Sequence, residues 1–301
     1  MANKNMIKRD LRNKLNWLNE NTKYNVAFLT LQGSQNYDMD TNKSDVDAKC
    51  FIVPSLEDMI SNKQPVSKTY RMDDNSLIDV KDIRLLPELL YKCNPAYLET
   101  LYTEYFITNN QYHRVPTLLL KSQLKELREE ICNRDVMRMM NALKGLVHQK
   151  QKHMERETEA TARDIEIYGY TPKDLHHLIR CAYMAEEINR RKKVDFQSLM
   201  TLDFLTKPKF NELKMYKTNP IPKIEAERLA QMYVNKVDRI VEEFEKENGR
   251  VVNPDVNEMV NQYVHDYIRF CLERDIITDY IDRRQQKKLK EIEEERSNIT
   301  E

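Results

Sequence analysis

The stretch that decides the fold is residues 31–47, LQGSQNYDMDTNKSDVD. A hydrophobic run at residues 26–31 leads into it, and a second run at residues 46–53 leads out of it. Because both runs are rich in strand-forming residues and Pro54 stops the second, we predict two strands that flank a polar loop. The loop begins with a Gly-Ser pair and ends with two aspartates.

Asp45 and Asp47 stand two residues apart at the start of the second predicted strand. Since successive side chains of a strand point to opposite faces, both carboxylates should lie on one face. Two neighbouring anions are costly unless a cation offsets them, so the pair favours a hard divalent ion such as Mg2+. An Asp-x-Asp sequence after a polar loop is also typical of a solvated turn, and the pair alone does not decide between the two.

A third acid on an adjacent strand would complete a two-metal site. Residues 77–80, LIDV, predict such a strand, and Asp79 lies inside it between hydrophobic residues. A carboxylate in that position needs a cation or a donor, so we expect Asp79 to be the third metal ligand. Asp82 is the alternative, although its place before a helical pattern favours a helix cap.

Gly33 is one of only four glycines in the chain. Neither a G-x-G-x-x-G nor a G-x-x-x-x-G-K-S/T sequence can be written with them, which excludes the Rossmann and P-loop classes of nucleotide site. A glycine is expected where the backbone turns sharply or approaches a ligand. We predict that Gly33 and Ser34 offer backbone N–H groups and a hydroxyl to a triphosphate, with an ordinary strand-ending turn as the alternative.

The pattern of elements changes about a third of the way along the chain. The first part predicts a helix, strands and a helix in the order expected of an α+β fold, with the helices at residues 8–18 and 82–91 and another strand at 68–72. The rest shows helical periodicity and almost no strand signal. We therefore predict an α+β domain over residues 1–112 and a helical domain over 113–301.

The helical domain has clear starts and stops. Its predicted helices cover residues 118–134, 138–162, 172–190 and 224–246. A last helix should start at Asn253, a suitable cap, and Pro254, which suits the first helical turn. The tail at residues 283–301 is almost wholly charged, and it is either a solvated helix end or disordered.

Composition restricts the class of protein. The 301 residues include 49 basic and 49 acidic side chains, so the net charge of zero provides no overall attraction to nucleic acid or to a membrane. No apolar stretch is long enough to span a bilayer, and the N-terminus has no signal sequence, so we expect a cytoplasmic protein. The five cysteines lack a C-x-x-C pair and are expected to be buried and unpaired.

A cationic stripe is predicted on the helix after Pro172. Lys173, His177 and Arg180 are spaced by four and three residues, which places them on one helix face. Such a stripe suits a triphosphate or a nucleic-acid backbone, and a solvated face is an equally acceptable interpretation.

Taken together, these features resemble the nucleotidyltransferases of the DNA polymerase beta superfamily, and most closely the RNA-repair-associated polymerase-beta family. That family has a G-S-x-x-Y-G loop before S-D-x-D, and the matching residues here are Gly33, Ser34, Tyr37, Ser44, Asp45 and Asp47. Asp38 replaces the glycine that follows the tyrosine. The resemblance continues through DVKDIR at residues 79–84, N-P-x-x-x-E at 94–99 and Y-x-P-K-x-x-x-H-L-x-R at 170–180.

The resemblance implies a nucleotidyltransferase fold with a mixed sheet, followed by a helical domain that closes over the nucleotide. It implies transfer of a nucleoside monophosphate from an NTP such as ATP to an acceptor hydroxyl, with Mg2+ (or Mn2+) required and pyrophosphate released. Tyr37 would then belong to the nucleotide site. RNA is the favoured acceptor, and the alternatives are an enzyme that transfers AMP to protein and a non-catalytic, antitoxin-like regulator. The sequence does not indicate the NTP or the oligomeric state.

Overall fold

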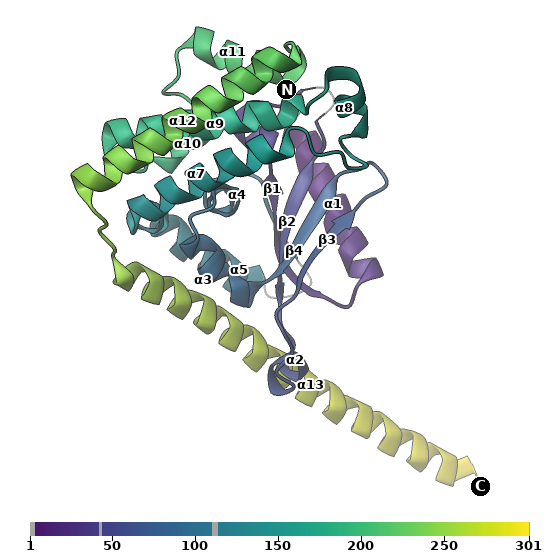
Figure 1. Cartoon of the computed structure of the whole chain (residues 1–301). Coiled ribbons are helices and arrows are strands. Elements are labelled where there is room, and N and C mark those ends of the chain that lie inside the picture. The colour runs from purple at the N-terminus through teal and green to yellow at the C-terminus, as the bar shows by residue number, and fades with distance from the viewer. Residues whose placement is uncertain (1–3, 42–43, 110–113, 301) are drawn as a thin grey trace.

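The fold was analysed in a computed structural model, which describes residues 4–41, 44–109 and 114–300. A five-stranded mixed sheet forms its centre (Figure 1). The strands are β1 (Asn25–Gln32), β2 (Asp47–Val53), β3 (Ser67–Arg71), β4 (Leu77–Asp82) and β5 (Phe106–Thr108). Their order is β3-β4-β2-β1-β5, and only the β2–β4 pair is parallel. The predicted strands are confirmed, and the three-residue β5 is an addition.

One face of the sheet packs on α1 (Lys4–Asn21), the predicted first helix. Leu11 and Leu18 of this helix are fully buried with Leu31 of β1 and Ile78 of β4. Because side chains alternate along each strand, the residues between these apolar ones point to the opposite face. That opposite face carries the acids and faces the helical part of the chain.

Short helices and 3-10 turns connect the strands. They are η1 (Ser34–Tyr37), α2 (Leu56–Ile60), η2 (Ile83–Leu85), α3 (Leu86–Tyr91), α4 (Pro95–Leu98) and η3 (Glu99–Leu101). The helix predicted over residues 82–91 is therefore a 3-10 turn followed by a short α-helix. The short elements α2, α4 and η3 were not predicted, because each has too few residues to show a hydrophobic periodicity.

The rest of the chain is helical, as predicted. Its helices are α5 (Arg114–Glu126), α6 (Arg128–Asn133), α7 (Val136–His153), α8 (Ala162–Tyr168), α9 (Pro172–Arg191), α10 (Phe196–Thr201), α11 (Lys207–Thr218), α12 (Lys223–Asn248) and α13 (Pro254–Thr300). Figure 1 shows α7, α9 and α12 stacked on the side of the sheet away from α1. The predicted domain boundary at residue 112 lies outside the described residues.

Two of the predicted helices have different bounds in the structure. The helix expected over residues 118–134 is divided at Leu127 into α5 and α6. The helix expected over residues 138–162 ends at His153, because the chain turns there and the N–H of Thr171 donates to the Met154 carbonyl at 2.8 Å. Tertiary contacts therefore override a helical periodicity that continues through the turn.

The last helix, α13, starts as predicted. The side chain of Asn253 accepts a hydrogen bond from the N–H of Asp255 at 3.2 Å, and Pro254 occupies the first helical position. The charged tail is helical through Thr300, its side chains at residues 283–289 are exposed, and this end of α13 projects beyond the rest of the molecule (Figure 1). Within the described ranges, all five cysteines are buried and free, and no helix is long and apolar enough to cross a membrane.

Candidate active site

The turn after β1 depends on Gly33. Its backbone angles, φ +103° and ψ −153°, belong to a region that is open almost only to glycine. Asn36 fixes the turn from within, because its side-chain amide donates to the Leu31 carbonyl at 3.0 Å and accepts from the Thr103 hydroxyl at 2.8 Å. Ser34 begins η1, and its hydroxyl has no hydrogen-bond partner among the described residues. A free hydroxyl therefore stands at a rigid turn.

Asp45 and Asp47 lie at the entry to β2, opposite the end of β1. Gln32 pairs with Asp47 across the two strands, while Val46 points to the other face and is buried there. The N–H of Leu77 donates to Asp47 Oδ1 at 2.8 Å. Burial raises the pKa of Asp47, and the charge of Asp45 adds to this effect. Neither carboxylate forms an ion pair within the described part of the chain.

Asp79 lies on the same sheet face but has a different environment. Its neighbour in the parallel β2–β4 register is Lys49, whose Nζ lies 3.7 Å from Asp79 Oδ2. Lys81, two residues further along β4, places its Nζ 2.8 Å from Asp79 Oδ1 and donates to the Ser67 hydroxyl at 2.7 Å. The charge of Asp79 is thus offset by two lysines. We refer to Lys49 and Lys81 below as the lysine pair.

Asp82 has the capping role that the sequence favoured. Its Oδ1 accepts from the N–H of Arg84 at 2.9 Å, which caps η2. The Arg84 guanidinium also donates to both carboxylate oxygens, at 3.0 and 2.6 Å. Because Asp82 is buried and points away from the acid-bearing face, it lies apart from Asp45 and Asp47.

Glu99 is a buried carboxylate beside the turn after β1. It lies 3.5 Å from the Asn36 amide nitrogen and is 1% exposed. Burial raises its pKa to about 7, while Lys49, the Tyr37 hydroxyl and Arg180 act in the opposite direction. Glu99 therefore connects the turn after β1 with the lysine pair and with α9.

The predicted stripe on α9 is directed at this turn, but its three members differ. The Arg180 guanidinium lies 3.8 Å from the centre of the buried Tyr37 ring, and its Nε is buried without a described hydrogen-bond partner. Lys173 is exposed, and its charge lowers the pKa of Asp47. Burial and Arg180 lower the pKa of His177 well below its usual value, so this imidazole is neutral near pH 7.

Lys217 of α11 is a cation that the sequence analysis missed. Its Nζ donates to the Met39 carbonyl at 2.8 Å, and burial followed by the charge of Lys173 lowers its pKa to about 8. No periodicity predicted α11, so nothing placed this lysine near residues 33–47. The contact of the lysine pair with Asp79 was not predicted either, because Lys49 lies beside Asp79 only through the β2–β4 register. The signal was a lysine inside the hydrophobic run at residues 46–53.

The carboxylates fit one divalent ion better than a complete three-acid site. Asp45 and Asp47 supply adjacent carboxylate oxygens that form no ion pair within the described residues, and such oxygens are the ligands that Mg2+ prefers. The carboxylate oxygens of Asp79 already form ion pairs with Lys49 and Lys81. Across residues 4–41, 44–109 and 114–300, no three His, Cys, Asp or Glu side chains are clustered closely enough to hold a metal ion.

Comparison with known proteins identifies the family of the chain. The RNA repair pathway DNA polymerase beta family matches residues 7–269, which is most of the chain. The chain belongs to this family. It is therefore a nucleotidyltransferase of the polymerase beta type, as the resemblance implied. Enzymes of this family generally use a divalent metal ion and an NTP.

Other comparisons add little. No curated protein matches the sequence. A nucleotidyltransferase-like protein from Exiguobacterium sibiricum 255-15 is similar in structure, at 12% identity and a TM-score of 0.28, over 87% of this chain and 80% of that protein. A similarity this distant carries no argument about the site.

Proposed function

We propose that this nucleotidyltransferase transfers a nucleoside monophosphate from an NTP to a hydroxyl group of RNA, with Mg2+ as cofactor and pyrophosphate as the second product. The observation that carries the proposal is the pairing of Asp45 and Asp47, neither of which forms an ion pair in the described part of the chain, beside the rigid turn at Gly33. Nucleic acid is the acceptor that the family suggests. A protein acceptor is the alternative outcome of the experiment below.

Each side chain has a part in the proposed reaction. Asp45 and Asp47 hold the divalent ion, and Gly33 and Ser34 offer N–H and hydroxyl donors to the phosphates. A bound ion would polarise the α-phosphate and stabilise the pyrophosphate leaving group. The charge of Asp47 is costly in the empty site, since burial already raises its pKa.

Three cations face the phosphates in this proposal. Lys173 and Arg180 of α9 and Lys217 of α11 all lie toward residues 33–47. They offset the charge of a triphosphate, while the neutral His177 contributes packing and hydrogen bonding rather than charge. The Tyr37 ring packs against the Arg180 guanidinium and is too deeply buried to stack on a base.

Asp79 joins the acidic pair only after Lys81 releases it. In the proposal this step needs only rotation of the long Lys81 side chain, while Lys49 stays buried with its Nζ 4.4 Å from the centre of the Tyr97 ring. In the proposal, Asp79 is the third acid, and Lys81 compensates its charge in the empty enzyme.

The test is incubation with each α-labelled NTP, Mg2+ or Mn2+, and a mixture of RNA and proteins, followed by separation of the labelled products. Label in RNA is expected from the wild type, and none from Asp45→Asn or Asp47→Asn. Asp38→Asn is a matched control, because this exposed residue of the same loop has φ +53°, which asparagine tolerates. Unchanged labelling by both acid variants would refute the mechanism, and label in protein alone would refute the RNA acceptor.

A further inference from the structure

A separate pocket opens at the β5 edge of the sheet. Its volume is about 320 Å³, which is within the range of small-molecule sites. We call it the β5 pocket. Among the residues that line it are Phe28, Tyr102, Phe106, Lys121, Lys125 and Arg128.

The β5 pocket has an excess of positive charge. Lys121 and Lys125 are four residues apart on α5 and form no ion pair within the described chain. The Glu104 carboxylate at the rim is occupied by Lys4, at 3.0 Å. Burial and the charge of Lys125 lower the pKa of Lys121, as expected when two ammonium groups lack an anion. An anion placed here would relieve their repulsion.

Aromatic rings form the floor of the β5 pocket. Phe106 stacks on Phe28 with ring centres 4.7 Å apart, and Lys121 Nζ lies 4.2 Å from the centre of the Phe106 ring. The Arg128 guanidinium lies 4.6 Å from the centre of the Tyr102 ring. Rings beside lysine and arginine are the groups that bind single-stranded nucleic acid, because bases stack on rings while cations meet phosphates.

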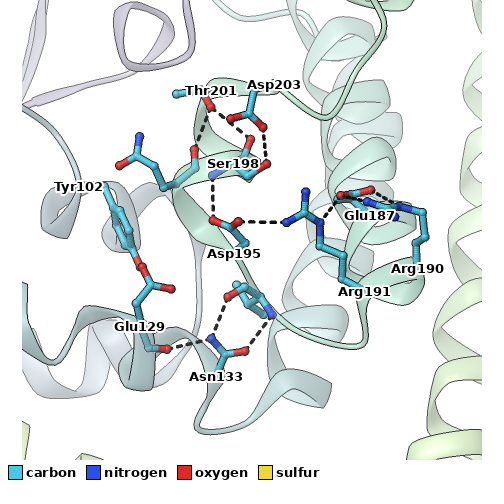
Figure 2. Close-up of polar contacts among 12 residues, drawn as sticks. Tyr102, Glu129, Asn133, Glu187, Arg190, Arg191, Asp195, Ser198, Thr201 and Asp203 are labelled. Carbon is cyan, nitrogen blue, oxygen red and sulfur yellow. Dashed lines mark hydrogen bonds and ion pairs between the residues drawn. The ribbon is translucent and has the colours of Figure 1, made fainter.

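Polar contacts hold Tyr102 and α10, which both contribute lining residues to the pocket. The Tyr102 hydroxyl donates to Glu129 at 3.0 Å (Figure 2). Asp195 caps α10 by accepting from the N–H of Ser198 at 3.1 Å, and Arg191 of α9 donates to Asp195 at 3.1 Å (Figure 2). Gln197, on the capped helix, lines the pocket and is exposed, so its amide is available to a base edge.

The β5 pocket lies on the same sheet face as the acidic pair. Phe28 in the pocket and Gln32 beside Asp47 are four residues apart on β1, a span of about 13 Å. Thr103 lines the pocket and donates to Asn36 in the turn after Gly33. A chain bound in the pocket is therefore within a few nucleotides of the candidate active site.

We propose that the β5 pocket binds one nucleotide of the acceptor strand, with its phosphate at Lys121 and Lys125 and its base beside the partly exposed ring of Phe106. The inference rests on the proposed function for the identity of the ligand. It assigns RNA binding to α5 as well as to the α9 stripe, whose Arg180 is already engaged with Tyr37.

The experiment measures the anisotropy of a fluorescein-labelled single-stranded oligoribonucleotide, without NTP or metal, across a series of salt concentrations. Lys121→Gln with Lys125→Gln is expected to weaken binding roughly tenfold at low salt and to lower the slope of log K against log salt by about 1.4. The matched control is Lys8→Gln with Arg12→Gln, which has the same spacing on α1 and the same charge change on the opposite face. The control should bind as the wild type does.

The aromatic contribution is measured separately. Phe106→Leu is expected to weaken binding about fivefold or more at every salt concentration, with the slope unchanged, because stacking is lost and charge is kept. Equal effects of the pocket and control pairs, unchanged affinity in the pocket pair, or no binding by the wild type at low salt would each overturn the inference. Pyrophosphate release from labelled NTP tests the proposed function independently, since it does not require the β5 pocket to be the RNA site.

Discussion

Glu99 should make the folded protein less stable as the pH rises, because burial of its carboxyl group disfavours the charged form. Its pKa moves from 4.5 to about 7 on folding. A carboxyl whose pKa is raised in the folded state holds its proton more tightly there than in the unfolded chain. The contribution of Glu99 to stability is therefore fully present below about pH 4.5 and is lost as the pH rises from there through about 7.

The magnitude can be worked out from the size of this shift. One pKa unit corresponds to about 1.4 kcal/mol, so the full effect is about 3 kcal/mol. Between about pH 5 and about pH 8, roughly 2 to 3 kcal/mol of this should be lost. Glu99→Gln removes the ionisable group but keeps the size and polarity of the side chain, so the loss should vanish in that variant.

The assay is urea unfolding at both pH values, monitored by the fluorescence of Trp17, the single tryptophan. The free energy of unfolding of Glu99→Gln minus that of the wild type is expected to increase by roughly 2 to 3 kcal/mol from about pH 5 to about pH 8. Glu88→Gln, an exposed glutamate of α3 paired only with Lys92, should show no such increase. A difference that is the same at both pH values would refute the argument from burial.

Three further substitutions test the site. Asp79→Asn should lower turnover about 10- to 100-fold and also lower the melting temperature, because the buried Lys49 loses this carboxylate partner; wild-type turnover would remove Asp79 from the mechanism. Asp82→Ala should lower the free energy of unfolding by about 2 kcal/mol, because the helix cap and the Arg84 contact are lost. The folded variant should keep its turnover. A loss of turnover without a loss of stability would make Asp82 the third acid. Gly33→Ala should cost about 1 to 3 kcal/mol of backbone strain, seen in urea unfolding, and an unchanged midpoint would show that the turn can relax.

Much of the fold could be predicted from the sequence because its long elements have strong periodicity. The strands from residue 26 to residue 80 and the helices α9 and α12 coincide closely with the predicted ranges, and α13 begins where its start was predicted. The three residues of β5 form a strand only because β1 offers them an open edge. Such a strand has no local signal, so the β5 pocket could not be predicted.

The candidate site was predictable to the extent that its chemistry is local. Asp45 and Asp47 share a face because they are two residues apart, and Asp82 caps η2 because a helical turn begins at the next residue. The partners of Asp79 are different, because Lys49 becomes its neighbour only through the parallel β2–β4 register. Sequence spacing alone could not show that Asp79 would lie beside compensating lysines.

A net charge of zero does not prevent this protein from binding a polyanion, because folding separates the charges. Lys173 and Lys217 come from different helices and meet at the turn beside Asp47, while Lys121 and Lys125 stand together at the β5 pocket. Surface fields act over about a Debye length, roughly 8 Å at physiological salt. At that range a bound nucleotide is affected by the local cation groups and not by the sum over the chain. The salt dependence of RNA binding should therefore depend on the few lysines near the phosphates. Comparing the paired substitutions on α5 with those on α1 then distinguishes binding at a local site from attraction to the overall charge of the protein.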